Sequence, residues 1–174
     1  MESPSPCEAA MSEFEAFYRE HVGLVHALAR GRSADAWQAE DLAQDTFLRA
    51  WQHFGSLSGL GPPVQRAWLA RTLRNLSIDA WRRNSAAPEL LEDDAPAAAG
   101  EEQAALRIDL AQALSQLGDM DREMVMLRYL GDLNSREIGE AMGIPEGTVR
   151  RRLAESRETL AEHLSAWAPA GEAR

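Results

Sequence analysis

A stretch of acidic residues, proline and alanine near the middle of the chain separates two blocks with helical periodicity. Residues 85–104 include an acidic run at 92–94 and a Pro-Ala-Ala-Ala-Gly run at 96–100, and they offer few apolar side chains to bury. Such a composition is typical of a flexible linker. Apolar residues recur at helical spacing on both sides, and no segment alternates with the period of a strand. The sequence therefore predicts an all-α protein made of two small helical domains joined by a flexible acidic linker.

The periodic segments also set the expected domain boundaries. We expect a disordered head over 1–11, a first domain over 12–84, the linker over 85–104, a second domain over 105–165 and a tail over 166–174. A capping box formed by Ser12 and Glu15 predicts the start of the first helix. Two further helices are expected over about 35–54 and 64–83, and the glycines and prolines of 55–63 predict a loop between them.

The second domain contains a helix-turn-helix pattern. Asn134, with Glu137 three residues later, predicts a capping box at the start of a short helix. The Gly-Ile-Pro run at 143–145 ends this helix, and another helix follows over about 146–164. Two amphipathic helices around so tight a turn are typical of a helix-turn-helix, the motif that places a recognition helix in the major groove of DNA.

The distribution of charge leaves both domains available for nucleic acid. The chain carries 28 acidic and 18 basic residues, a formal net charge of −10. Residues 86–121 hold 9 acidic residues and 1 arginine, whereas 1–85 and 122–174 are each within one charge of neutral. Every basic residue is an arginine, whose planar guanidinium can pair with two acceptors of a base or phosphate. The excess acid therefore belongs mainly to the linker.

Several functional classes are disfavoured because their motifs are missing. The sequence has no GxxxxGK[ST] loop, no GxSxG elbow and no HExxH motif. Its single cysteine, Cys7, excludes an internal disulfide, and the four histidines lack ligand spacing, so we expect neither a metal nor a cofactor and no enzyme activity. No apolar run approaches the roughly 18 residues of a membrane helix, and the N-terminus does not resemble a signal peptide. We therefore expect a cytoplasmic protein without membrane insertion.

The helix expected over 35–54 has two contrasting faces. At about 100° per residue, its small and aromatic residues gather on one side and indicate the face that packs in the core. The opposite face carries Asp41, Gln44, Asp45, Leu48 and Gln52. A leucine inside an acidic, amide-rich face suits the docking of another protein's helix. An ordinary solvent-exposed face is the alternative.

The helix expected over 64–83 carries arginines on its outer face, in contrast to the acidic outer face of the helix expected over 35–54. Leu69, Leu73 and Leu76 form its inner face. The outward and flanking positions are held by Arg71, Arg74, Asn75, Ile78, Arg82 and Arg83. Arginines and an amide beside Trp68 suit phosphate contacts combined with base stacking. Alternatively, the arginines only solvate the helix end and favour its dipole.

Arginines also follow the helix-turn-helix turn. Arg150, Arg151 and Arg152 lie just inside the N-terminus of the last helix, where a recognition helix enters the major groove. Thr148 precedes them, and Arg136 lies in the preceding helix. We predict that these five residues contact DNA.

Taken together, these segments resemble the conserved regions of bacterial RNA polymerase sigma factors. The segments FEAFYREH at 14–21, AEDLAQDTFLRAW at 39–51 and AWLARTLRNLSID at 67–79 are similar to region 2. The segments LRYL at 127–130 and EIGEAMGIPEGTVRRRL at 137–153 are similar to region 4. Both regions occur in the family's order with only a linker between them, as in the extracytoplasmic-function (ECF) group.

This resemblance implies a role for each surface. The face containing Asp41 and Leu48 matches the family's motif for docking on the β′ clamp helices of core RNA polymerase. The 64–83 helix and the 55–65 loop match the parts that open the −10 element and hold a flipped base, and the helix-turn-helix matches the −35 reader. The resemblance further implies contact with the β flap, binding to promoter DNA and control by an anti-sigma factor.

Some residues depart from the family pattern. The 55–65 loop lacks the charged residues that are common there, so its base preference is open. Arg151 stands where the family often has serine, and Glu155 and Glu158 stand where basic residues are frequent. These differences predict a −35 contact that is weaker or differently specified.

Two other functions remain as alternatives. An autonomous helix-turn-helix regulator would use the first domain for sensing or dimerisation and would bind duplex DNA tightly without polymerase. An anti-sigma-like interaction adaptor would use the acidic face alone and would support no promoter-specific transcription.

Overall fold

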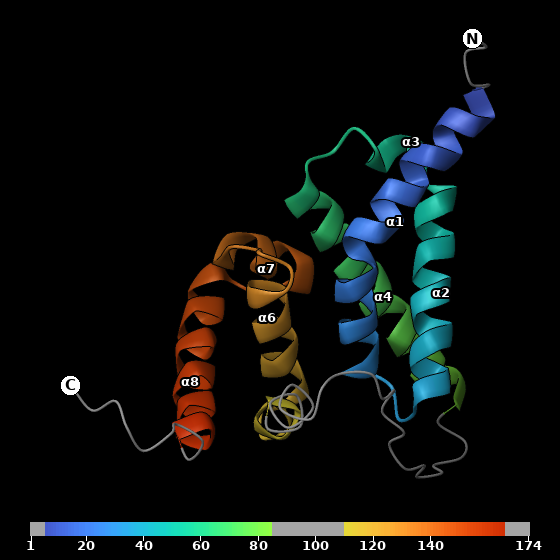
Figure 1. Cartoon of the computed structure of the whole chain (residues 1–174). Helices are drawn as coiled ribbons and strands as arrows, with labels where there is room; N and C mark the ends of the chain where they lie inside the picture. The colour runs from blue at the N-terminus through green and yellow to red at the C-terminus, as the bar shows by residue number, and fades with distance from the viewer. Residues whose placement is uncertain (1–5, 85–109, 166–174) are drawn as a thin grey trace.

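The computed structural model describes residues 6–84 and 110–165, and within these ranges it is helical without strands (Figure 1). The first range contains α1 (Pro6–Arg30), α2 (Ala36–Gln52), α3 (Phe54–Leu57) and α4 (Pro62–Asn84). The second contains a helical segment at 110–115, then α6 (Asp119–Tyr129), α7 (Ser135–Met142) and α8 (Glu146–Ser165). The predicted all-α fold is confirmed. The predictions for the linker, the tail, residues 1–5 and the side chain of Cys7 concern parts outside the described residues.

The first domain is a bundle of α1, α2 and α4, with the single turn of α3 across one end (Figure 1). Its core combines aliphatic and aromatic side chains, including Val25, Phe47, Leu69 and Leu73, all buried. The N-terminus of α2 is capped by Asp35, whose carboxylate accepts a hydrogen bond of 2.8 Å from the backbone N–H of Gln38. The predicted inner faces of α2 and α4 are thus the faces that pack in the bundle.

Two sequence-based expectations for this domain were wrong. Helix α1 begins at Pro6 rather than at Ser12, so residues 6–11 of the expected disordered head are helical. Proline is tolerated at the first helical position because its missing N–H needs no partner there, and the acid of Glu8 suits the helix dipole. The expected 55–63 loop begins with the turn of α3, because Phe54 and Leu57 are both buried in the core.

The second domain has the predicted helix-turn-helix. The capping box of α7 is confirmed: the Asn134 side chain accepts from the backbone of Glu137, and the Glu137 carboxylate accepts from the backbone of Asn134. Gly143 ends α7 in the left-handed conformation, with φ of 72°. Gly139 permits the tight approach of the two helices, because a Cβ there would lie 2.7 Å from the carbonyl oxygen of Ile144.

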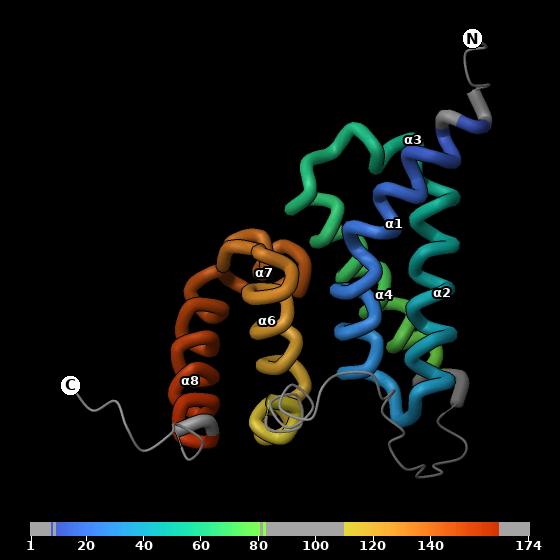
Figure 2. Tube along the Cα trace, viewed as in Figure 1, coloured from blue at the N-terminus to red at the C-terminus, as the bar shows by residue number. Residues whose placement is uncertain are grey.

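The two domains pack against each other. Figure 2 shows α6 and α7 beside α1 and α4, with α8 on the outer side. Arg66 Nη1 donates to the carbonyl oxygen of Gly131, and Arg74 Nη1 donates to that of Met142, each at 2.6 Å. Buried apolar residues of both domains form one continuous cluster. The linker therefore connects two domains that already share a polar and apolar interface.

A buried ion pair lies at the same interface. Arg32, just after α1, pairs with Glu123 of α6, and their side chains are only 19% and 5% exposed. Arg32 also donates to the hydroxyl of Ser77 on α4 at 3.3 Å. One arginine thus links α1, α4 and α6.

Candidate protein-docking and nucleic-acid surfaces

The outer face of α2 has the arrangement expected from the sequence. The structure exposes all five of its predicted residues, Asp41, Gln44, Asp45, Leu48 and Gln52. Leu48 is 59% exposed on this face. Helix α2 therefore presents two carboxylates and two amides around one apolar side chain.

Sequence reasoning missed an exposed tryptophan on this face. Trp37 is 83% exposed, in the first turn of α2. It precedes Asp41, Gln44 and Leu48 by 4, 7 and 11 positions, the spacing that keeps side chains on one side of a helix. The same periodicity that identified the other residues would have included Trp37 if the stripe had been extended by one turn. We call Trp37 and the five predicted residues together the α2 stripe.

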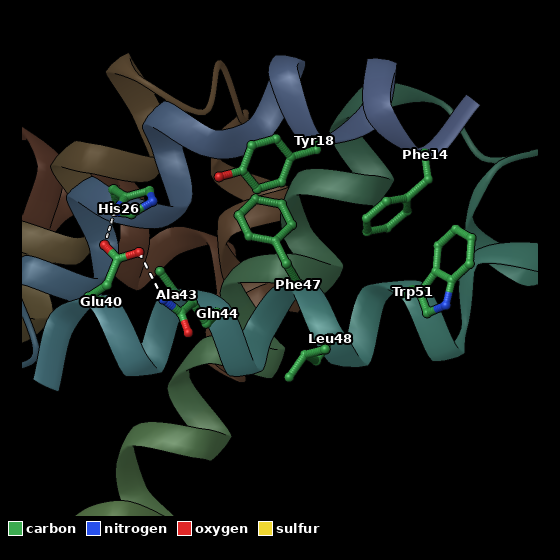
Figure 3. Close-up of a pocket in the computed structure, with 9 residues that line it drawn as sticks. All are labelled: Phe14, Tyr18, His26, Glu40, Ala43, Gln44, Phe47, Leu48 and Trp51. Atoms are coloured by element: carbon green, nitrogen blue, oxygen red, sulfur yellow. Dashed lines mark hydrogen bonds and ion pairs between the residues drawn. The ribbon is translucent and has the colours of Figure 1, made fainter. Parts of the chain in front are cut away.

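A hollow of about 340 Å³ opens between α1 and α2 beside this stripe. Figure 3 shows Phe14, Tyr18, Phe47, Leu48 and Trp51 around it, so its walls are mainly aromatic and apolar. The Phe14 and Trp51 rings meet edge to face, with centroids 4.8 Å apart. Such a hollow can receive an apolar side chain of a partner helix.

The polar end of the hollow is held by three side chains. Glu40 lies 3.5 Å from Nδ1 of His26 and accepts a hydrogen bond of 3.2 Å from Nε2 of Gln44 (Figure 3). Gln44 therefore belongs both to the α2 stripe and to the wall of the hollow. A partner that bound the stripe would cover the hollow as well.

The arginine surface of α4 is only partly exposed. Arg71, Asn75 and Arg82 are exposed, whereas Ile78 and Arg74 are half-buried. The guanidinium of Arg74 is engaged by Met142 of the second domain. Arg83 is part of α4, but its side chain is outside the described residues. All six predicted −10 residues therefore lie on α4, and the second domain engages one of them, Arg74.

The arginines of the helix-turn-helix differ in their partners. Arg136 pairs with Glu140 at 3.0 Å, and this hydrogen bond raises the pKa of the Arg136 guanidinium above its ordinary value. Arg150 lies 3.7 Å from Glu146, and Arg151 lies 2.6 Å from Glu155. Arg136, Arg150 and Arg151 are exposed, and Thr148 is half-buried beside them. The three arginines are therefore open to solvent.

Arg152 is placed differently from its two neighbours. Its Nη1 lies 2.9 Å from the carboxylate of Asp121 on α6, and the two side chains are 33% and 30% exposed. The pair joins α6 to α8 and holds the guanidinium of Arg152 toward α6. Sequence reasoning could not separate Arg152 from Arg150 and Arg151, because Asp121 lies 31 positions away.

Neither a metal cluster nor a membrane span occurs in the part of the chain that the structure describes. No three histidine, cysteine or carboxylate side chains there are grouped to hold a metal ion. None of the described helices is long and apolar enough to cross a membrane.

Comparisons with known proteins match both parts of the chain to regions of one protein family. The family model for Sigma-70 region 2 matches residues 17–87, and that for Sigma-70, region 4 matches residues 107–160. The ECF RNA polymerase sigma factor SigL of Mycobacterium tuberculosis is 37% identical over 158 residues, covering 84% of each chain.

Solved structures show the same fold. The sigma factor RpoE, in complex with the anti-sigma factor NepR from Bartonella quintana, matches with a TM-score of 0.64 and 26% identity, over 87% of this chain and 98% of that chain. CnrH, in complex with the cytosolic domain of CnrY, matches with a TM-score of 0.60 and 23% identity over 88% of each chain. The chain therefore belongs to the sigma-70 family of bacterial RNA polymerase sigma factors, in its extracytoplasmic-function (ECF) group.

Proposed function

We propose that this protein joins core RNA polymerase in the cytoplasm as a promoter-specificity subunit. The α2 stripe docks on the β′ clamp helices, and the second domain lies on the β flap. Helix α4 and the 55–65 loop contact the −10 element, and α7 and α8 contact the −35 element. The protein supplies recognition and promoter melting, whereas the chemistry of RNA synthesis belongs to the polymerase.

The observation that carries this proposal is the exposed Leu48 at the centre of the α2 stripe. Contact with water is unfavourable for an apolar side chain, and Leu48 is 59% exposed. Burying it against a partner would be favourable by about 1 kcal/mol or more. Asp41 and Asp45, about two turns and one turn before Leu48 on the same face, favour a partner helix that carries basic residues. The adjacent aromatic hollow offers a second place for an apolar side chain of the same partner.

The −10 assignment is supported by the chemistry of α4. Arg71 and Arg82 can neutralise phosphates, and the Asn75 amide can donate to or accept from a base edge. The Trp68 ring lies half-buried on the same helix, with its centroid 5.9 Å from that of His53. Aromatic rings of this kind can stack with unpaired bases and so offset part of the cost of strand separation.

The −35 assignment is supported by the position of Arg150 and Arg151. They lie at the fifth and sixth positions of α8, directly after the tight turn that follows α7. In helix-turn-helix proteins the N-terminal residues of the second helix contact base edges. Each arginine can exchange its exposed ion pair for a DNA contact at little cost.

An anti-sigma factor is the further partner that we propose. The solved relatives RpoE and CnrH are each bound to another protein, and NepR is described as an anti-sigma factor. For this chain the α2 stripe is the surface that such a factor would need to cover to prevent docking on polymerase.

Charge reversal on the α2 stripe tests the docking assignment. We expect Asp41→Arg combined with Asp45→Arg to abolish binding to purified core polymerase, because both carboxylates would become cations facing the same partner. The matched control is Glu13→Arg with Glu20→Arg, which makes the same charge change on exposed positions of α1. Binding is measured by fluorescence anisotropy, with circular dichroism to confirm folding. Unchanged core affinity in the stripe variant would remove the docking claim.

Two assays separate this function from its alternatives. An autonomous regulator would bind promoter duplex tightly in the absence of polymerase, whereas a sigma factor needs the polymerase for tight binding. An interaction adaptor would bind a protein partner through α2 but would support no promoter-specific transcription. The arginine surfaces on both α4 and α8 favour the sigma role over the adaptor.

A further inference from the structure

We propose that His21 and Gln65 are positioning residues that hold the loop between α3 and α4 ready to receive an unpaired base of the −10 element. This inference rests on the proposed function, in which that loop contacts the −10 element. It assigns a role to two buried polar residues that lie beneath the loop and outside every surface described above.

A chain of hydrogen bonds runs from α1 to the end of α3. Nε2 of His21 lies 3.0 Å from Oε1 of Gln65, and Nε2 of Gln65 donates to the carbonyl oxygen of Leu57 at 3.0 Å. His21 is fully buried, and Gln65 is 8% exposed. These two hydrogen bonds form a bridge, from His21 through Gln65 to Leu57. The bridge ties the last residue of α3 to the first turn of α4 and fixes both to α1.

The partners define the direction of each hydrogen bond. The Leu57 carbonyl can only accept, so the amide nitrogen of Gln65 faces it and Oε1 faces the histidine. Because Oε1 can only accept, Nε2 of His21 carries the hydrogen. Nδ1 of His21 is buried without a hydrogen-bond partner among the described residues. The ring itself is held by Phe17, whose ring meets it edge to face at a centroid distance of 4.6 Å.

Apart from this bridge, the loop is held by backbone hydrogen bonds at its ends: the N–H of Ser58 donates to the carbonyl oxygen of Phe54 at 2.8 Å, and the N–H of Gln65 donates to that of Gly61 at 3.1 Å. Gly59 and Gly61 contribute no side chains, and none of the described residues has an atom within 4 Å of the position that a Cβ of Gly59 would occupy. Leu60 and Val64 are 41% and 52% exposed. The backbone N–H of Leu60 donates to the same Leu57 carbonyl that accepts from Gln65. The Leu57 carbonyl is thus the point at which the bridge and the loop meet.

This arrangement has a direct consequence for base capture. A loop that is already fixed loses less conformational entropy when it binds a flipped base than one that must first be ordered. Leu60 and Val64 offer the base apolar contacts at the edges of a loop whose ends are fixed by Leu57 and Gln65. Without these hydrogen bonds, the side-chain link between the two ends of the loop is lost, although the residues of the loop itself are unchanged.

The test uses holoenzyme assembled from core polymerase and the full-length chain. Promoter opening is measured by permanganate reactivity of unpaired thymines, and base preference by opening on templates that carry each base at every −10 position. His21→Leu removes one buried neutral hydrogen bond and should lower opening about three- to tenfold, whereas Gln65→Leu removes two and should lower it at least as much. The double variant should lose little more than Gln65→Leu alone, because that single change already breaks both hydrogen bonds. His21→Gln, which keeps a donor near the position of Nε2, should recover part of the loss.

The controls separate positioning from stability and from the role of the loop itself. Val25→Ala makes a cavity elsewhere on α1, where Val25 is fully buried, and serves as the match for lost stability. Equal loss of opening in Val25→Ala and His21→Leu at equal loss of stability would overturn the proposal.

Leu60→Ala reports on the loop directly. If Leu60→Ala changes the −10 base preference while His21→Leu and Gln65→Leu change neither preference nor opening, the positioning role fails and the loop assignment stands. If Leu60→Ala also has no effect, the loop assignment fails and the positioning role fails with it.

Discussion

The two arginine surfaces of the molecule differ in what their guanidinium groups bind. On α4, Arg74 donates to a carbonyl of the second domain, as does Arg66 about two turns earlier on the same helix. On α8, Arg150 and Arg151 pair with glutamates of their own helix, one turn before and one turn after them. The −10 surface is therefore partly covered by the second domain, whereas the −35 surface is open to solvent.

This difference determines which contacts within the protein must break before each surface binds DNA. An exposed ion pair contributes only about 0–1 kcal/mol, so Arg150 and Arg151 can leave their glutamates easily. Arg74 loses its hydrogen bond to Met142 when the two domains separate, and the same separation breaks the buried pair of Arg32 and Glu123. We therefore expect the −35 surface to be ready for DNA in the free protein and the −10 surface to become fully available only when the domains separate.

The largest effect on domain packing is expected from removing the carboxylate of Glu123, which pairs with Arg32 across the domain interface. Glu123→Ala leaves the guanidinium of Arg32 buried and unpaired, which costs roughly 3–5 kcal/mol in the packed arrangement and is relieved when the domains separate. Fluorescence energy transfer between probes at Gln52 on α2 and Glu158 on α8 should fall strongly. Glu155→Ala, which breaks an exposed pair on α8, should leave the transfer unchanged. Equal transfer in wild type and Glu123→Ala would show that this pair does not hold the domains together.

A second test removes an interface arginine that is not among the proposed DNA contacts. Arg66→Ala loses the hydrogen bond to Gly131, and we expect it to weaken domain packing by about 1.5 kcal/mol, the low end for a charged hydrogen bond. The value is low because Nε of Arg66 is already buried without a partner among the described residues. Energy transfer should fall while promoter opening by the holoenzyme is retained. Arg71→Ala, at an exposed position of α4, should do the reverse. Loss of promoter opening in Arg66→Ala with unchanged transfer would place Arg66 among the DNA contacts instead.

A third test addresses the open surface. Arg150→Ala with Arg151→Ala should lower −35-dependent transcription about five- to tenfold, near the low end of what base contacts contribute. Stability should hardly change, because both ion pairs are exposed. If both arginines contact phosphates rather than bases, the salt dependence of binding should become shallower by about 1.8 in slope. An equal loss on promoters with a scrambled −35 sequence would argue against a reading role.

The smallest effect is expected from breaking the ion pair between Arg151 and Glu155, both on α8. Glu155→Gln removes the ion pair of 2.6 Å and one negative charge near the proposed DNA surface. The free energy of unfolding should change by less than about 0.5 kcal/mol, and −35-dependent binding should rise about twofold. Glu158→Gln makes the same charge change without releasing Arg151 and should have a smaller effect. A fall in binding would indicate that Glu155 holds Arg151 in its DNA-contacting position.

Local features of the fold could be predicted from the sequence because their causes lie within a few residues. The capping box of Asn134 and Glu137 and the left-handed Gly143 depend only on neighbouring backbone groups, and both were predicted. The outer face of α2 followed from helical spacing alone. The start of α1 at Pro6 and the turn of α3 were missed, and α3 depends on the burial of Phe54 and Leu57 in a core built by distant segments.

The interface between the domains was beyond sequence reasoning. Arg32 and Glu123 lie 91 positions apart on opposite sides of the linker, and Arg74 binds a backbone carbonyl, which leaves no pattern in the sequence. The bridge from His21 to Gln65 likewise joins residues 44 positions apart. Helical periodicity indicates which face of a helix is buried but not which distant residue it meets there.

Run-off transcription with purified core polymerase on genomic promoter fragments tests the sigma assignment most directly. We predict defined transcripts only when the polymerase and this protein are both present, and their loss when the α2 stripe carries Asp41→Arg and Asp45→Arg. Transcripts that do not depend on the protein, or promoter-specific duplex binding by the protein alone without any transcription, would contradict the account.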